Sequence, residues 1–106
     1  MSTLYIDSIG LAQDVRVILS PIARRDQDLA KRLRRACDEV PERIAEGMCL
    51  TGRPRRVEYE AARMSAREAL ACLKAAESVG YLRDGDEGLA LRIQGLVRRI
   101  STTLEN

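Results

Sequence analysis

The chain has 106 residues with 18 basic and 16 acidic side chains, so its formal net charge is only +2. That length suits one domain with a single core, and we expect residues 1–106 to form it. So small a net charge does not indicate a nucleic-acid partner, which only local clustering of charge could provide. Seven glycines and three prolines are too few for a turn-rich all-β protein.

The chain contains no Phe, Trp or His and only three Tyr, so its core has to be aliphatic. Its cysteines, Cys37, Cys49 and Cys72, form no Cys-x-x-Cys pair. Zinc sites, Glu-x-x-His metal sites and imidazole-assisted nucleophiles are therefore not expected. The sequence predicts a non-enzymatic protein without metal or cofactor. Because it has no 18-residue apolar stretch and no signal-like N-terminus, we expect no membrane segment and a cytoplasmic location.

The first periodic segment predicts a helix over residues 4–22. Its apolar positions recur in steps of three and four, with Ser8 filling one slot. Proline disfavours helical geometry at the residue before it, so Pro21 is expected to end this helix. The apolar positions are Leu4, Leu11, Val15, Ile18 and Ile22.

The second segment predicts a helix over residues 26–48. Asp26 or Asp28 can cap its start, where a carboxylate also suits the helix dipole. Pro41 removes one backbone donor and should bend the helix without ending it, because the apolar stripe continues in phase beyond it. Gly47 is the expected C-terminal stop. The stripe consists of Leu29, Leu33, Ala36, Cys37, Val40 and Ile44.

Two more helices are expected, over residues 55–79 and 89–104. A loop at 49–54 precedes the third helix, Gly80 should cap its end, and residues 83–86 should form a turn. The third helix carries a second face of small and apolar residues, so it should contact more than one neighbour. That second face comprises Val57, Ala61, Met64, Ala71 and Ala75. Four amphipathic helices with short links predict an all-α, antiparallel up-down four-helix bundle.

Three runs of the sequence occur in a recognisable order. The first run, Leu29 to Gly47, contains Leu-x-x-x-Leu-Arg-Arg-Ala and then Ile-Ala-Glu-Gly. In the second run, a basic link at 52–56 leads into the small-residue helix at 59–69. The third run is Gly80-Tyr81-Leu82. Together they resemble a bacterial four-helix-bundle family. That family includes proteins encoded within intervening sequences of ribosomal RNA genes and accessory proteins of diversity-generating retroelements. The resemblance implies a ring-shaped homo-oligomer, most often a pentamer. For the retroelement branch it implies binding to a reverse transcriptase and nucleic acid.

The chain departs from the family's pattern near a contact that small polar residues would make. Asp38 and Glu39 stand where Ser is usual, Arg43 where Asn is usual, and Met64 where Gly is usual. If those small residues mediate a specific contact, this chain has changed it.

We expect an oligomer contact at Arg43, Glu46 and Met64. Glu46 precedes the expected helix end, where negative charge is disfavoured. The alternative for Glu46 is a salt bridge within the chain, to Arg43 or Arg53.

Two basic clusters form the candidate nucleic-acid-binding set. Between residues 24 and 35, six basic residues stand against Asp26 and Asp28, a local balance of +4. The second cluster lies in the link at 53–56, and the bundle should place the two at different heights. A ring of subunits would repeat each cluster and multiply its phosphate contacts. The set is Arg24, Arg25, Lys31, Arg32, Arg34, Arg35, Arg53, Arg55 and Arg56.

The other interpretation of the first cluster is a solvated, salt-bridged face. Arg34 and Arg35 have Asp38 and Glu39 four residues further on, and Glu39 has Arg43. Each such pair contributes only about 0.2–0.5 kcal/mol, but together the pairs would neutralise much of the cluster.

Two functions follow from the sequence. The first is an oligomeric bundle that binds RNA or another nucleic acid electrostatically, without sequence-specific reading, because Tyr5, Tyr59 and Tyr81 are scattered and offer no stacking platform. We expect Tyr81 to pack over a bundle end instead. The alternative is a protein-interaction adaptor, such as an accessory subunit of a retroelement reverse transcriptase.

Overall fold

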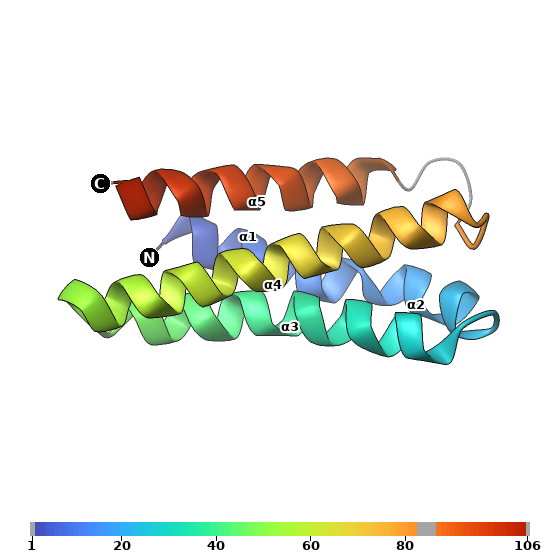
Figure 1. Cartoon of the computed structure of the whole chain (residues 1–106), viewed down its shortest axis with the longest axis horizontal. Coiled ribbons are helices and arrows are strands. Elements are labelled where there is room, and N and C mark those ends of the chain that lie inside the picture. Colours follow the sequence, from blue (N-terminus) through green and yellow to red (C-terminus); the bar gives the residue numbers. More distant parts are fainter. Residues whose placement is uncertain (1, 83–86, 106) are drawn as a thin grey trace.

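Five α-helices form the four arms of an antiparallel bundle in the computed structural model, which describes residues 2–82 and 87–105 (Figure 1). The predicted turn at 83–86 lies outside the described residues. The bundle measures 43 × 22 × 21 Å. The first arm consists of two helices and each other arm of one. The helices are α1 (Thr3–Asp14), α2 (Arg16–Ala23), α3 (Gln27–Met48), α4 (Gly52–Ser78) and α5 (Glu87–Glu105).

The arms enclose one aliphatic core, as the composition predicted. α1 packs against α3 and α5, and α4 packs against α3 and α5, so each arm has two neighbours. The largest fully buried side chains come from every arm. They include Leu11, Ile22, Leu33, Ile44, Leu73, Ile93 and Ile100.

The first arm bends at Val15, which ends α1 and begins α2, rather than stopping at Pro21 as predicted. Pro21 lies inside α2. Its ring prevents a hydrogen bond to the carbonyl of Val17, but Val17 is 79% exposed, so water can satisfy that carbonyl. Ile22 is fully buried and holds the last turn of α2 against the core.

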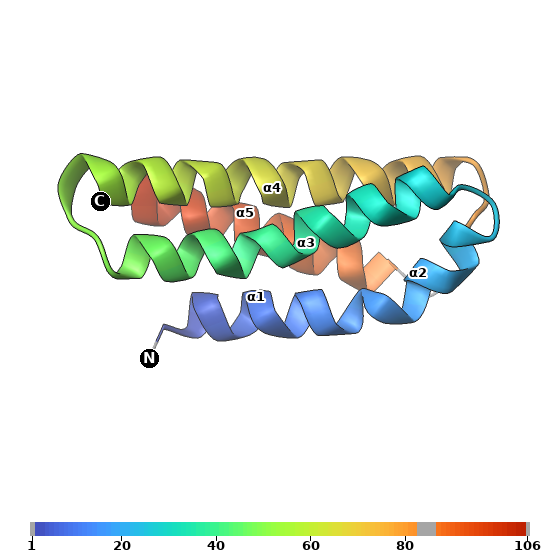
Figure 2. The same cartoon turned by 90° about the horizontal axis from the view of Figure 1, so that it is seen from below.

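The second arm, α3, agrees with the sequence at its start and middle. Asp26 is the cap: its Oδ1 accepts a hydrogen bond from the Leu29 backbone N–H at 3.0 Å. Pro41 lies inside the helix, which continues for seven further residues to Met48. Figure 2 shows α3 changing direction near its middle, as a proline bend requires.

Gly47 does not stop α3, contrary to the prediction. The helix ends at Met48 with Cys49 as its cap, and Gly47 does not adopt a positive φ. Gly47 is instead buried against the ring of Tyr59. Glycine is suited to this position because of its small size and not because of its conformational freedom.

The third arm, α4, begins at Gly52, three residues before the predicted start, so the link from α3 spans only residues 49–51. Gly52 has φ +62°, a value that favours glycine. At the other end Gly80, with φ +78°, is the predicted cap. The N–H of Tyr81 donates to the Ala76 carbonyl at 2.9 Å and that of Gly80 to the Glu77 carbonyl at 3.1 Å. These two bonds define a Schellman motif.

The two ends of the bundle carry different chain segments. We call the end with the turn at residues 24–26 the α2–α3 end, and the end with the link at 49–51 the α3–α4 end. Figures 1 and 2 show that α1 begins and α5 ends at the α3–α4 end. Tyr81, at the opposite end, is partly buried against the core, which agrees with the packing expected of it.

Candidate functional site

Five basic side chains from the first predicted cluster are exposed at the α2–α3 end. Two lie in the turn after α2 and three on α3, where steps of three and four residues place them on the side opposite the buried Leu29 and Leu33. No described carboxylate lies within 4.0 Å of their charged groups. We call this set the basic face. It consists of Arg24, Arg25, Lys31, Arg34 and Arg35.

The acidic residues expected to neutralise the basic face are engaged elsewhere. Asp38 pairs with Arg16 of α2 at 3.2 Å. Glu39 accepts a hydrogen bond from the hydroxyl of Ser65 on α4 at 3.1 Å. The expected pairs from Arg34 and Arg35 along α3 are therefore absent among the described residues, because groups on neighbouring helices occupy the acids. The salt-bridged interpretation of this surface is wrong for these two arginines.

Arg32, the sixth member of the first cluster, does not belong to the basic face. Its Nη2 lies 2.6 Å from Oε1 of Glu68 on α4. This hydrogen bond lowers the pKa of the Glu68 carboxyl and raises that of the Arg32 guanidinium. The pair joins α3 to α4 on the surface, so the Arg32 guanidinium is already engaged within the chain.

The second cluster lies at the α3–α4 end, and its three arginines have different surroundings. Arg53 is exposed. The guanidinium of Arg55 lies 4.5 Å from the centre of the Tyr59 ring, a cation–π contact. Arg56 pairs with Glu60 at 2.9 Å and donates to the Leu104 carbonyl at 2.8 Å.

The two clusters lie at different heights along the bundle, as the sequence led us to expect, and the structure places them toward its opposite ends. Between Arg35, the last member of the first cluster, and Met48 at the end of α3, the helix extends for about 20 Å at 1.5 Å per residue. The nine predicted nucleic-acid-binding residues therefore do not form one continuous surface, and only the basic face remains as an exposed cluster.

The three residues predicted at an oligomer contact have separate environments. Arg43 pairs with Glu58 on α4 at 3.3 Å, within the chain. Glu46 is exposed and forms no ion pair with another described residue, so the salt bridge considered for it with Arg43 or Arg53 is absent. Met64 is 71% exposed.

Met64 belongs to the second face of α4, which the bundle leaves uncovered. Val57 is 53% exposed, and Ala71 and Ala75 are exposed as well. The sequence predicted that α4 has more than one neighbour, and it does contact α3 and α5. Neither neighbour buries this face, however, apart from Ala61, which is half-buried.

An apolar groove lies between α2 and α3 beside the basic face. It encloses about 290 Å³, and Leu19, Ala23 and Ala30 contribute its apolar lining. Lys31 and Arg34 stand on its rim. An apolar groove with a cationic rim suits an acidic, amphipathic segment of another protein.

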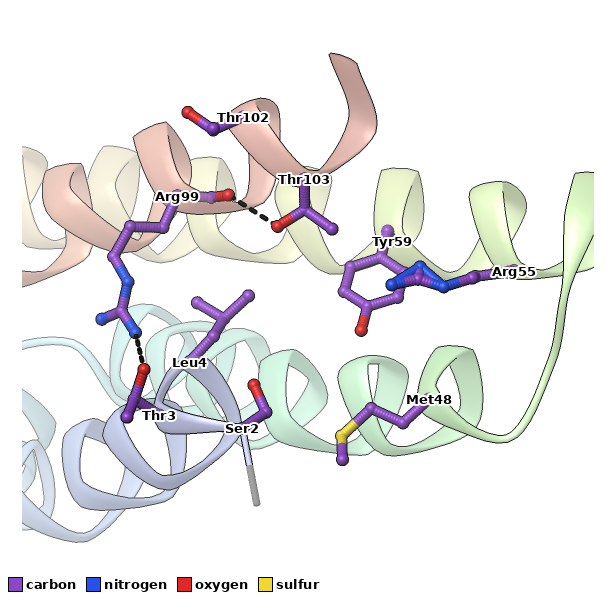
Figure 3. A pocket seen from close by; sticks show the side chains of 9 residues that line it. All are labelled: Ser2, Thr3, Leu4, Met48, Arg55, Tyr59, Arg99, Thr102 and Thr103. Atoms are coloured by element: carbon purple, nitrogen blue, oxygen red, sulfur yellow. Dashed lines mark hydrogen bonds between the residues drawn. The ribbon is translucent and has the colours of Figure 1, made fainter. Parts of the chain in front are cut away.

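Tyr59 is the residue that the sequence analysis missed. It is 4% exposed, and a Cβ on Gly47 would lie 2.6 Å from its Cε2. Figure 3 shows its ring between the Arg55 guanidinium and the start of α1, with its hydroxyl directed away from α4. Two features of the sequence could have identified Tyr59. It is an aromatic residue four positions after an arginine, and a glycine lies in the apolar stripe of the preceding helix.

The cysteines and acids of the described residues form no metal site. No group of three or more potential metal ligands occurs among residues 2–82 and 87–105. Cys37 and Cys72 are buried and Cys49 is exposed, and all three are free thiols. Burial raises the pKa of the Cys37 thiol to about 12. Over the same residues, no helix combines the length and apolarity that crossing a membrane requires.

Comparison with known proteins identifies a solved structure with a similar fold. No family model and no curated protein matches the chain. A crystal structure of a protein of unknown function from the S23 ribosomal protein family of Bacteroides thetaiotaomicron is similar over 98% of this chain and 100% of that one. The TM-score is 0.87 at 13% sequence identity. The chain thus shares its four-arm helical fold with a member of the S23 ribosomal protein family.

Proposed function

We propose that this protein is a non-enzymatic helical bundle that binds RNA, or another nucleic acid, through the basic face. The observation that carries the proposal is the exposure of five cations at the α2–α3 end while nearby Asp38 and Glu39 are engaged by other helices. The ribosomal-protein name of the structurally similar family agrees with an RNA ligand. We also propose kinship with the ribosomal RNA intervening-sequence proteins that the sequence resembles.

Binding through the basic face is electrostatic and indifferent to sequence. Arginine forks match phosphate oxygens in a bidentate way, and each phosphate neutralised releases counterions. Stacking on aromatic side chains, which most readers of single-stranded RNA use, requires an aromatic residue that the basic face does not contain.

Self-association would multiply these contacts. The uncovered face of α4, with Val57 and Met64 exposed, offers an apolar surface for a second copy. A ring, most often a pentamer in the family that the sequence resembles, would present five basic faces to one nucleic acid. Repeated weak sites raise avidity without any new contact.

The test is binding of a fluorescently labelled single-stranded RNA, followed by anisotropy at several salt concentrations. We expect the Arg34→Glu/Arg35→Glu variant to bind at least tenfold more weakly. The salt slope should fall by about 1.4 for two lost phosphate contacts, at about 0.7 per contact. The matched control is Arg67→Glu/Lys74→Glu, the same charge change at two exposed positions on α4. Equal losses in both variants, or an unchanged slope, would refute the proposal.

The apolar groove beside the basic face favours the alternative, a protein-interaction adaptor such as an accessory subunit of a reverse transcriptase. An adaptor should retain a reverse transcriptase encoded beside its gene through a high-salt wash. Ala23→Asp, which places a charge in the groove, should release it, whereas Arg34→Glu/Arg35→Glu should weaken it much less. If neither variant changes retention, the groove is not the docking site.

A further inference from the structure

A second site lies at the α3–α4 end, far from the basic face. A depression of about 580 Å³ opens there between the start of α1, the start of α4 and the end of α5 (Figure 3). A second depression of about 500 Å³ adjoins it and shares Arg55, Tyr59 and Thr103 as lining residues. The first volume lies within the usual range of small-molecule sites, roughly 300–1,000 Å³.

The lining is cationic and rich in hydroxyl groups. Arginines 55, 56 and 99 line the two depressions, and no described Asp or Glu does. Ser2 and Thr3 contribute hydroxyls from the start of α1, and Thr102 and Thr103 from the last turns of α5. Such a lining favours an anion with a polar body.

Two of the three arginines are already occupied. Arg99 pairs with Asp7 at 2.6 Å and donates to the Thr3 hydroxyl at 3.1 Å. Arg56 pairs with Glu60. Arg55 forms no ion pair with a described carboxylate and is held only by its stacking on Tyr59, so its guanidinium remains available to a ligand.

Tyr59 supplies the second available donor. Its side chain is 4% exposed and lines both depressions, yet its hydroxyl makes no hydrogen bond to another described residue. Among the described residues, the buried side-chain polar atom without a partner is Arg63 Nε, so the Tyr59 hydroxyl reaches the surface, where a ligand can bond it. The Ser2 hydroxyl oxygen accepts from the Tyr5 N–H at 3.4 Å, which leaves its own proton free to donate.

Two helix N-termini strengthen the positive potential of the site. α1 begins at the wall of the depression, and α4 begins beside it at Gly52. Thr51, the N-cap residue of α4, makes no side-chain capping bond. Unpaired N–H groups at a helix start attract anions.

We propose that this depression binds a phosphate monoester, with the Arg55 guanidinium and the Tyr59 and Ser2 hydroxyls holding the phosphate oxygens. The Thr102 and Thr103 hydroxyls donate to the carbonyls of Arg98 and Arg99, and both threonines line the part of the depression where the sugar of a mononucleotide would lie. The phosphate can belong to a free mononucleotide or to the 5′ end of an RNA strand, because both present the same group. The site lies at the end opposite the basic face and does not depend on it.

The experiment titrates the full chain with uridine monophosphate and with uridine by calorimetry. We expect the monophosphate to bind at least tenfold more tightly than the nucleoside. Arg55→Gln should weaken monophosphate binding at least tenfold, and Tyr59→Phe about threefold, since it removes the hydroxyl and keeps the ring. Arg53→Gln is the matched control: it makes the same charge change at an exposed arginine outside the depression, and it should alter binding less than twofold.

A second arm separates the two sources of phosphate. A 5′-phosphorylated oligouridylate that binds at least tenfold more tightly than its 5′-hydroxyl counterpart assigns the site to RNA ends; equal binding of the two strands assigns it to free nucleotides.

The proposal is overturned if neither phosphate probe binds, if uridine binds as well as its monophosphate, or if Arg53→Gln and Arg55→Gln lose affinity equally. If Tyr59→Phe does not fold, as judged by circular dichroism, the Arg55→Gln and Arg53→Gln comparison still decides. Arg34→Glu/Arg35→Glu should leave monophosphate binding unchanged, so this site and the basic face can fail separately.

Discussion

At the scale of single residues, Gly47 and Tyr59 form a close contact between α3 and α4. A Cβ at position 47 would lie 2.6 Å from Cε2 and 2.8 Å from Cδ2 of the Tyr59 ring. The ring is rigid, buried and covered by Arg55, so it has little room to shift. Only hydrogen fits between the helix backbone and the ring.

We predict that Gly47→Ala destabilises the protein by about 1–2 kcal/mol. Overpacking a core typically costs about 1–3 kcal/mol, and the better helix propensity of alanine offsets up to about 1 kcal/mol of it. Urea unfolding followed by circular dichroism measures the change. Gly95→Ala is the control, because no atom lies within 4 Å of its added Cβ, and it should be neutral or stabilising. Equal stability of Gly47→Ala and the wild type would contradict this account.

A buried thiol at Cys37 makes stability depend on alkaline pH. Burial raises the pKa of the folded-state thiol from 9.0 to about 12, so the folded protein disfavours the thiolate that the unfolded chain forms more easily. The resulting stability is fully present below pH 9 and is lost as pH rises through about 12. We predict a steeper loss of unfolding free energy between pH 8 and pH 11 for the wild type than for Cys37→Ala. Parallel pH profiles would show that Cys37 does not contribute.

At the scale of secondary-structure elements, the two long helices start in different ways. Asp26 caps α3 through its hydrogen bond to the Leu29 N–H at 3.0 Å. Thr51 precedes α4 in an extended conformation without a side-chain cap. The positive φ of Gly52 brings the chain into α4 instead. The two starts therefore depend on different residues.

We predict that Asp26→Ala lowers the unfolding free energy by about 1 kcal/mol, the usual value of a lost N-cap. Thr51→Ala is the matched change at the other helix start and should cost less than about 0.5 kcal/mol, since no capping bond is lost. Chemical unfolding of both variants gives the comparison. A larger loss in Thr51→Ala than in Asp26→Ala would contradict the capping geometry.

At the scale of the whole molecule, the fold separates the two proposed binding sites along its long axis. The basic face occupies the α2–α3 end, the cationic depression the α3–α4 end, and the uncovered face of α4 runs between them. Basic side chains are therefore clustered toward both ends of the bundle, although the net charge is only +2. Self-association through α4 would leave both ends open to ligands.

We predict that Met64→Glu abolishes self-association, because it replaces an apolar side chain that is 71% exposed on this face of α4 with a charge. Light scattering coupled to gel filtration should give a mass near the 11.8 kDa of one chain, against five times that mass for a pentameric wild type. Leu91→Glu is the control, since it makes the same kind of change at an apolar side chain that is 65% exposed on a different helix, α5. A wild type that is monomeric at working concentrations would rule out the ring.

Local sequence determined most of the fold. The apolar stripes, the Asp26 cap, the Gly80 stop and the continuation of α3 through Pro41 all depend on residues within one or two turns, and the structure agrees with each prediction. The predictions that Pro21 and Gly47 end their helices were wrong, because the conformation at both positions depends on their tertiary surroundings and not only on neighbouring residues. Val17, four residues before Pro21, is 79% exposed, so water can satisfy its carbonyl, and a buried ring occupies the space beside Gly47.

Only the tertiary structure decided which charges remain available. Spacing along α3 pairs Asp38 with Arg34 and Glu39 with Arg35, but helix packing brings Arg16 and Ser65 close enough to take both acids. Such exposed pairs differ by only a few tenths of a kcal/mol, so proximity across helices selects among them. For the same reason, Tyr59 and Arg55 became a candidate site only when three chain segments met at one end of the bundle. The sequence by itself determined the architecture and the surplus of arginine; packing decided where that surplus is free to bind.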